Sequence, residues 1–108
     1  MARVAKTKIA QKEKNDLLYR AILKLENEDE CYRFFQDLCT ISELRAMEQR
    51  FEVATLLDED MIYSEILEKT GASSATISRV NRSLINGAGG YNSILEKMKE
   101  DKKEQTEE

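Results

Sequence analysis

The 108-residue sequence contains no histidine, proline or tryptophan, and only four glycines and two cysteines. Without histidine it lacks the commonest general base and zinc ligand, and two cysteines alone cannot complete a tetrahedral zinc site. The missing proline and scarce glycine favour long helices over a sheet with many turns. No apolar run approaches about 18 residues, and the N-terminus lacks the apolar segment of a signal peptide, so we expect a cytoplasmic protein without a membrane span.

The remaining composition, 41% apolar and 35% charged, is that of a small folded domain. Cys31 and Cys39 are eight residues apart, which predicts two buried thiols on one helical face. The acidic run of Asp58, Glu59 and Asp60 is interpreted as a solvated turn and not as a catalytic pair. We therefore expect no catalytic residue, no metal site and no cofactor, and the protein is not expected to be an enzyme.

The net charge of −4 is unevenly distributed along the chain. Residues 1–14 carry a net charge of +4, and residues 15–70 carry −8. Residues 71–95 contain two arginines and no acidic residue, and residues 96–108 return to −2. The acid-free window indicates a surface that faces an anion, with a neutral loop rich in serine and asparagine as the alternative.

The spacing of apolar residues predicts six helices. They are expected from Lys12 to a stop at Asn27, across Cys31–Cys39, from Thr40 or Ser42 to Leu57, over 62–70, from Ser73 or Ser74 to Ile85, and over 91–103. For the second of them, Asn27 or Asp29 is the expected N-cap.

Residues 1–11 are predicted to be a basic flexible arm, 12–103 a helical dimerisation and DNA-binding domain, and 104–108 a charged tail. The apolar stripe between Cys31 and Cys39 is wide for so small a protein. Such a stripe favours burial from two sides, which a homodimer would supply.

The strongest local pattern covers residues 62–85, where a short helix, a tight turn at Gly71 and a second helix are predicted. Glycine lets two helices cross steeply without a Cβ clash, and Ile66 and Ile77 are placed to pack the helices together. Ile77, Val80 and Leu84 recur at helical spacing and predict the buried stripe of the second helix. The pattern is that of a helix-turn-helix, and an ordinary amphipathic helix pair is the alternative.

The opposite face of the second helix is expected to carry hydroxyls and two guanidiniums but no carboxylate. These groups suit phosphate and base-edge contacts in the major groove of double-stranded DNA, and the helix N-terminus offers free N–H groups to a phosphate. The expected DNA-binding residues are Ser73, Ser74, Thr76, Arg79, Asn81 and Arg82. The basic arm is expected to add non-specific, salt-sensitive attraction.

A second group of residues between positions 40 and 84 forms a recognisable pattern. It comprises Thr40, Glu43, Ala46, Arg50, Gly71-Ala72, Ala75-Thr76-Ile77, Arg79 and Ser83-Leu84. These residues, with the run 45–50, resemble the core of the Trp repressor family, and in particular its YerC/YecD branch, over about residues 35–100. The resemblance implies an all-α, six-helix, intertwined homodimer whose two helix-turn-helix units face one side of the DNA.

In the family's repressor, two arginines hold the corepressor L-tryptophan beside the recognition helix. By resemblance, the effector pocket of this chain comprises Thr40, Arg50, Arg79, Val80 and Ser83. Val80 stands where the tryptophan-binding members have glycine, and displacing its side chain for an indole would cost about 1–3 kcal/mol. We expect that L-tryptophan is not the corepressor, and that Val80 fills the pocket in advance. For Arg50, an ion pair with a nearby glutamate is the alternative role.

The sequence thus predicts a bacterial, sequence-specific, homodimeric DNA-binding transcriptional regulator, with repression implied by the resemblance and a small-molecule effector left unidentified. The alternative is a helical homodimeric protein-interaction module without sequence-specific DNA binding. The two differ in their response to salt, because DNA binding through several phosphates weakens steeply as ionic strength rises.

Overall fold

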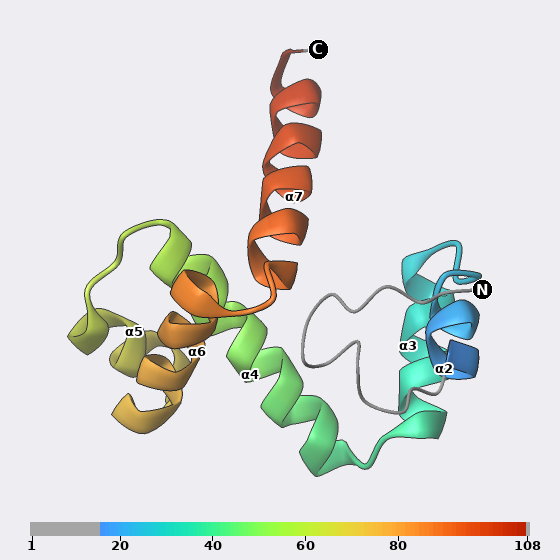
Figure 1. Cartoon of the computed structure of the whole chain (residues 1–108), viewed down its shortest axis with the longest axis horizontal. Coiled ribbons are helices and arrows are strands. Elements are labelled where there is room, and N and C mark those ends of the chain that lie inside the picture. The colour runs from blue at the N-terminus through green and yellow to red at the C-terminus, as the bar shows by residue number, and fades with distance from the viewer. Residues whose placement is uncertain (1–15, 108) are drawn as a thin grey trace, which may run out of the picture. The chain divides into compact units, whose positions relative to one another are not determined.

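The computed structural model describes residues 16–107, and over this range it contains six helices and no strand (Figure 1). The helices are α2 (Asp16–Ile22), α3 (Glu28–Leu38), α4 (Ile41–Asp58), α5 (Tyr63–Thr70), α6 (Ser74–Asn86) and α7 (Gly90–Glu107). The predicted all-α class with six helices is confirmed. The predicted basic arm and the predicted helix start at Lys12 lie outside the described residues. None of the described helices is both long and apolar enough to cross a membrane.

Two predicted helix ends are wrong. The first helix was expected to run to Asn27, whereas α2 ends at Ile22, and the N–H of Leu25 closes a turn by donating to the Ile22 carbonyl at 3.1 Å. Asn27 has an extended backbone (φ −157°) and caps α3, so the chain must leave α2 before it. The last helix continues past Lys103 to Glu107, into the predicted tail, because the charged residues there are good helix formers.

Contacts divide the chain into two compact units, an N-terminal unit (Met1–Ile41) and a C-terminal unit (Ser42–Glu108). Each unit is described by itself, and the boundaries predicted for a single helical domain over 12–103 stay a prediction.

The N-terminal unit is organised by the start of α3. The Asn27 side chain accepts a hydrogen bond from the Glu30 N–H at 2.9 Å, and the Glu30 carboxylate accepts one from the Glu26 N–H at 2.9 Å. These two bonds satisfy N–H groups that a helix start leaves without partners. On the apolar face, Phe34 and Phe35 meet edge to face with ring centroids 5.3 Å apart. Even so, no residue of α2 or α3 is buried.

The two cysteines are free and half-buried, so the prediction of buried thiols is wrong for the single chain. Cys39 is the C-cap of α3 and its backbone is extended (φ −117°, ψ 154°), which places it just beyond the helix that was predicted to include it. Nearby apolar side chains are exposed as well, among them Leu38 at 51% and Ile41 at 71%. Within residues 16–41 the apolar face of the N-terminal unit is therefore left partly exposed.

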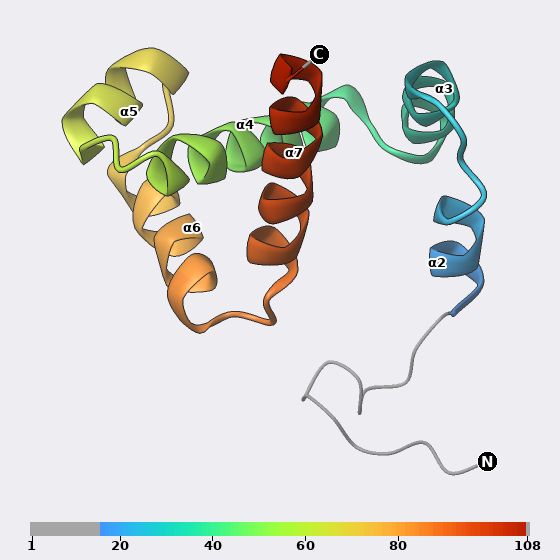
Figure 2. The same ribbon diagram turned by 90° about the horizontal axis from the view of Figure 1, so that it is seen from above.

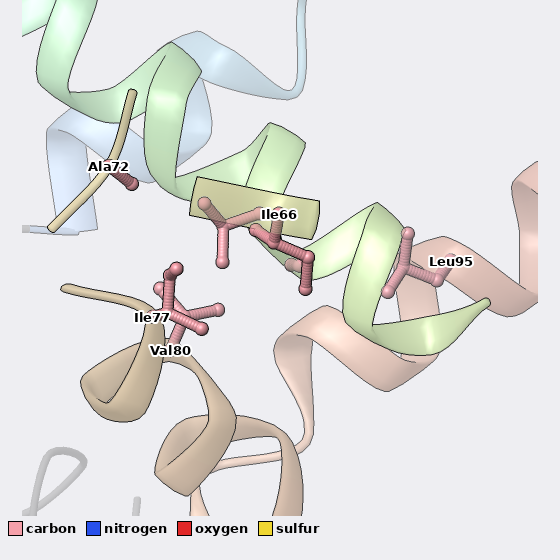
Figure 3. Close-up of a cluster of buried hydrophobic side chains, with 7 residues drawn as sticks. Ile66, Ala72, Ile77, Val80 and Leu95 are labelled. Carbon is pink, nitrogen blue, oxygen red and sulfur yellow. The ribbon is translucent and has the colours of Figure 1, made fainter. Parts of the chain in front are cut away.

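The C-terminal unit has a closed core. It comprises Val53, Ala54, Ile66, Ala72, Ile77, Val80 and Leu95, each at most 6% exposed. In Figure 3, Ile77 and Val80 on α6 point toward Ile66 on α5, and Leu95 on α7 extends the cluster. The predicted packing of Ile66 with Ile77 is confirmed, and α5 and α6 are held together by side chains that no water reaches.

Besides Leu95, an aromatic contact, a hydrogen bond and an ion pair link α7, which follows α6 in the chain, to the rest of the C-terminal unit (Figure 2). The Tyr91 ring stacks on Phe51 of α4 with centroids 6.3 Å apart, and the Asn92 side-chain amide donates to the Leu84 carbonyl at 2.9 Å. Further along, the Lys99 ammonium pairs with the Asp58 carboxylate at 2.8 Å. Together they connect α7 to α4 and α6 and close the core that supports α6.

Candidate nucleic-acid interface

The segment predicted at 62–85 folds as α5, a three-residue turn and α6. Gly71 ends α5 in the left-handed region (φ 74°, ψ 5°), and its N–H donates to the Leu67 carbonyl at 2.9 Å. Glycine adopts this left-handed conformation without strain, which suits it to a helix end. The predicted reason for glycine, a Cβ clash between the two helices, is wrong, because a Cβ added at Gly71 would meet no atom within 4 Å. Ala72, the next residue, is 2% exposed and belongs to the core, so the turn itself is anchored.

Ser73 caps α6. Its hydroxyl oxygen accepts a hydrogen bond from the Thr76 N–H at 3.1 Å, and its hydroxyl donates to the Thr76 hydroxyl oxygen at 3.1 Å. Of the two predicted N-caps, Ser73 and Ser74, Ser73 is the N-cap of α6. Its hydroxyl serves the helix start, whereas Ser74, the first residue of α6, is exposed.

The outer face of α6 is exposed and basic. Ala75, Arg79 and Arg82 are exposed on the side opposite the buried Ile77 and Val80. Among residues 16–107 neither guanidinium is paired with a carboxylate. Two unpaired cations beside small side chains leave room for the backbone of a polyanion to approach.

The other two predicted DNA-binding residues, Thr76 and Asn81, are only half-exposed. They flank the buried stripe of α6 on opposite sides, because five residues of helix turn by about 500°, which leaves the two positions about 140° apart around the axis. The structure therefore places Ser74, Arg79 and Arg82 on the open face, and it places Thr76 and Asn81 at its edges.

The residues of the predicted effector pocket are distributed over both units. Thr40 belongs to the N-terminal unit, whereas Arg50, Arg79, Val80 and Ser83 belong to the C-terminal unit. Arg50 and Ser83 are half-buried on α4 and α6, and Val80 is 2% exposed within the core. Val80 is thus part of the closed core, and the effector pocket itself stays a prediction.

Sequence reasoning missed the polar residues that hold the turn and α7 in place. The Gln49 side-chain amide of α4 donates to the Thr70 carbonyl at 3.2 Å. The hydrogen bond to Asp58 and the charge of that carboxylate raise the pKa of Lys99 above its usual 10.5. These pairs join residues far apart in the chain, so no local pattern indicates them. Only Thr70 carries a local signal, because a hydroxyl in the last turn of a helix often bonds the carbonyl four residues before it.

No group of three or more cysteine, aspartate or glutamate side chains within residues 16–107 is arranged to hold a metal ion.

A family model described as Trp repressor protein matches residues 13–99. The chain belongs to the Trp repressor family. YerC, an uncharacterized protein of Bacillus subtilis (strain 168), is 51% identical over 85 residues, which are 79% of this chain and 82% of YerC. The predicted relation to this family and to its YerC branch is confirmed.

Two solved structures of Trp repressor-like proteins have the same fold. A candidate Trp repressor from Staphylococcus aureus has a TM-score of 0.75 at 49% identity, covering 78% of this chain and 84% of its own. A TrpR-like protein from Eubacterium eligens ATCC 27750 has a TM-score of 0.75 at 50% identity, covering 86% and 91%.

Proposed function

We propose that this protein is a sequence-specific DNA-binding transcriptional regulator in which α5 and α6 form a helix-turn-helix. The observation that carries the proposal is the outer face of α6, where Arg79 and Arg82 are exposed and unpaired over a core that fixes the helix. No acidic residue occurs between 71 and 95. A helix with such a face fits the major groove, where guanidiniums bind phosphates or the edge of guanine. Such a regulator acts in the cytoplasm, where bacterial DNA lies.

Within the proposed interface the residues take different roles. Arg79, Arg82 and Ser74 are exposed at positions from which side chains reach phosphates or base edges. Thr76 and Asn81 contact DNA from the edges of the helix, and Ser73 aligns the first turn of α6 through its cap. The N–H groups at that helix start add a phosphate site.

A homodimer is part of the proposal. The N-terminal unit exposes Leu17, Leu23 and Leu38 at 67%, 83% and 51%, and none of its described residues is buried. Exposure of this kind marks a surface that another chain covers. A second copy would also present a second α6, and two half-sites are what a palindromic operator requires.

L-tryptophan is not proposed as the effector. Val80 is 2% exposed and packs with Ile66 and Ile77, so it would have to leave the core to admit an indole beside Arg79. Displacing a packed side chain costs about 1–3 kcal/mol, which weakens binding by roughly fivefold to 150-fold. The chain contains no tryptophan, so fluorescence of added L-tryptophan reports binding directly. No saturable binding is expected at micromolar concentration.

The test of the proposed function is a selection of bound duplexes from a random-sequence pool at physiological salt, with and without L-tryptophan. A palindromic motif enriched equally in both arms is the expected result. Enrichment only with L-tryptophan would show that the interpretation of Val80 is wrong. No enrichment in either arm would contradict sequence-specific DNA binding and would support the alternative, a protein-interaction module.

A further inference from the structure

One hydroxyl, that of Thr70, joins the end of α5 to the turn. It donates to the Ile66 carbonyl at 2.8 Å and accepts from the Ala72 N–H at 3.1 Å. The Ala72 N–H lies beyond the left-handed Gly71 and has no helical partner, so Thr70 supplies the acceptor it needs. A side chain of the same shape without the hydroxyl would lose both bonds.

A second hydrogen bond ties this turn to α4. The Gln49 side-chain amide donates to the Thr70 carbonyl at 3.2 Å, across 21 residues of sequence, and both residues are half-buried. The Thr70 carbonyl is among the last four of α5, which helix geometry leaves without an intrahelical N–H. The bond from Gln49 therefore adds a polar contact between α4 and the end of α5 to the apolar core that Ile66 shares with Val53 and Ala54 of α4.

From this point the chain enters α6 within three residues. Ala72 is buried in the core, and Ser73 then caps the helix through the Thr76 N–H. A continuous series of contacts therefore runs from α4 through Gln49, Thr70 and Ala72 to the first turn of α6. The direction of α6 depends on where this turn is held.

We propose that Gln49 and Thr70 are positioning residues that hold α6 in its DNA-reading orientation without a bound ligand. The inference rests on the proposed function and adds to it the internal contacts that replace a corepressor. Neither side chain is expected to touch DNA. Their effect is on how precisely Arg79 and Arg82 meet base edges, and less on the general attraction between arginine and phosphate.

The test compares pairs of variants of the full chain. Thr70→Val keeps the shape and removes the hydroxyl, and Thr70→Ser keeps the hydroxyl. Gln49→Met keeps the length of the side chain and removes the donor. Leu95→Val, which shortens a core side chain of α7 away from the turn, controls for a general loss of stability.

The first readout is the ratio of the dissociation constant for random duplex to that for the selected duplex. Thr70→Val and Gln49→Met should each lower this ratio by about fivefold to tenfold, the order of factor expected when hydrogen bonds that position α6 are lost. Thr70→Ser should have a ratio of dissociation constants close to that of the unchanged protein, and Leu95→Val should have the same ratio as the unchanged protein. A ratio for Thr70→Val equal to that of the unchanged protein would overturn the inference.

The second readout needs no DNA. Amide hydrogen exchange in the free protein should be about tenfold faster at Ala72 in Thr70→Val and unaltered in Thr70→Ser, because only the valine variant lacks the acceptor. Unaltered exchange at Ala72 in Thr70→Val would also overturn the inference. Failure of the proposed function is recognised separately, because the unchanged protein itself would then have a ratio near one.

Discussion

The N-terminal and C-terminal units are built from similar amphipathic helices, yet among the described residues only the C-terminal unit buries apolar side chains within one chain. The seven buried residues of the described part lie from Val53 to Leu95, whereas α2 and α3 bury none. In α3, Phe34 and Phe35 are half-buried and contact one another edge to face. The same kind of sequence pattern therefore has two different outcomes in this molecule.

The difference shows what an amphipathic pattern determines. It predicts which face of a helix will avoid water, but not which partner covers that face. In the C-terminal unit the partners are α4 to α7 themselves, closed by a tight turn and by contacts to α7. For the N-terminal unit we propose a second copy, so its stability is expected to depend on protein concentration.

The largest expected effect is the loss of stability when a side chain of the closed core is shortened. Ile77→Ala removes a side chain that is 0% exposed and should lower the free energy of unfolding by about 2–5 kcal/mol. Ile85→Ala, on the same helix but 68% exposed, should change it by about 0.5 kcal/mol or less. Urea unfolding followed by circular dichroism measures both, and equal losses would contradict the described burial.

The next effect concerns the open face of the N-terminal unit. Leu38→Glu places a charge on a side chain that is 51% exposed in the single chain, and a dimer would bury that charge without a partner. The dimer dissociation constant should rise about a hundredfold, as measured by sedimentation. Leu67→Glu, at a residue of α5 that is 45% exposed, serves as the control and should leave association unaltered. If both variants stay dimeric, this face is not the interface.

A smaller effect separates two glycines of the C-terminal unit. Gly71 has φ +74° and Gly90 does not have positive φ, and a Cβ added at either would meet no atom within 4 Å. Gly71→Ala therefore incurs only backbone strain, about 1–2 kcal/mol, whereas Gly90→Ala at the start of α7 should be neutral or stabilising. Gly71→Ala should lower the melting temperature, whereas Gly90→Ala should leave it unaltered or raise it. Similar losses in the two variants would show that steric contact, and not the sign of φ, determines the cost of the added Cβ.

The smallest effect compares ion pairs of the two units. Arg33–Asp29 lies on the exposed surface of α3, whereas Lys99–Asp58 joins α7 to α4. Because Asp58 raises the pKa of Lys99 in the folded protein above 10.5, the pair stabilises the fold below that pH and this contribution is lost as the pH rises through the raised value. The difference in urea midpoint between the unchanged protein and Lys99→Met should be constant up to about pH 10 and should be lost only as the pH rises through the raised pKa of Lys99. A difference that persists at higher pH would show that packing of the Lys99 stem, and not charge, is responsible.

The sequence was sufficient for the helices, for the Gly71 turn and for the packing of Ile66 with Ile77, because each depends on residues close in the chain or on helical spacing. The sequence-based prediction is wrong at the end of α2. Asn27 was expected to end this helix, but Asn27 caps α3, so α2 has to end before it. Sequence reasoning missed the bond from Gln49 to Thr70, since a contact across 21 residues leaves no local pattern. The half-exposure of Thr76 and Asn81 became visible only once the neighbours of α6 were in place.

The central claim, that the outer face of α6 binds DNA, is tested most directly by the salt dependence of binding to the selected duplex. For the unchanged protein the affinity should fall by roughly a hundredfold or more between about 50 and 200 mM salt. Arg82→Ala should weaken binding and reduce the slope of log affinity against log salt by about 1, whereas Lys97→Ala on α7 should match the unchanged protein. An affinity that is insensitive to salt, or identical with and without Arg82, would contradict the claim.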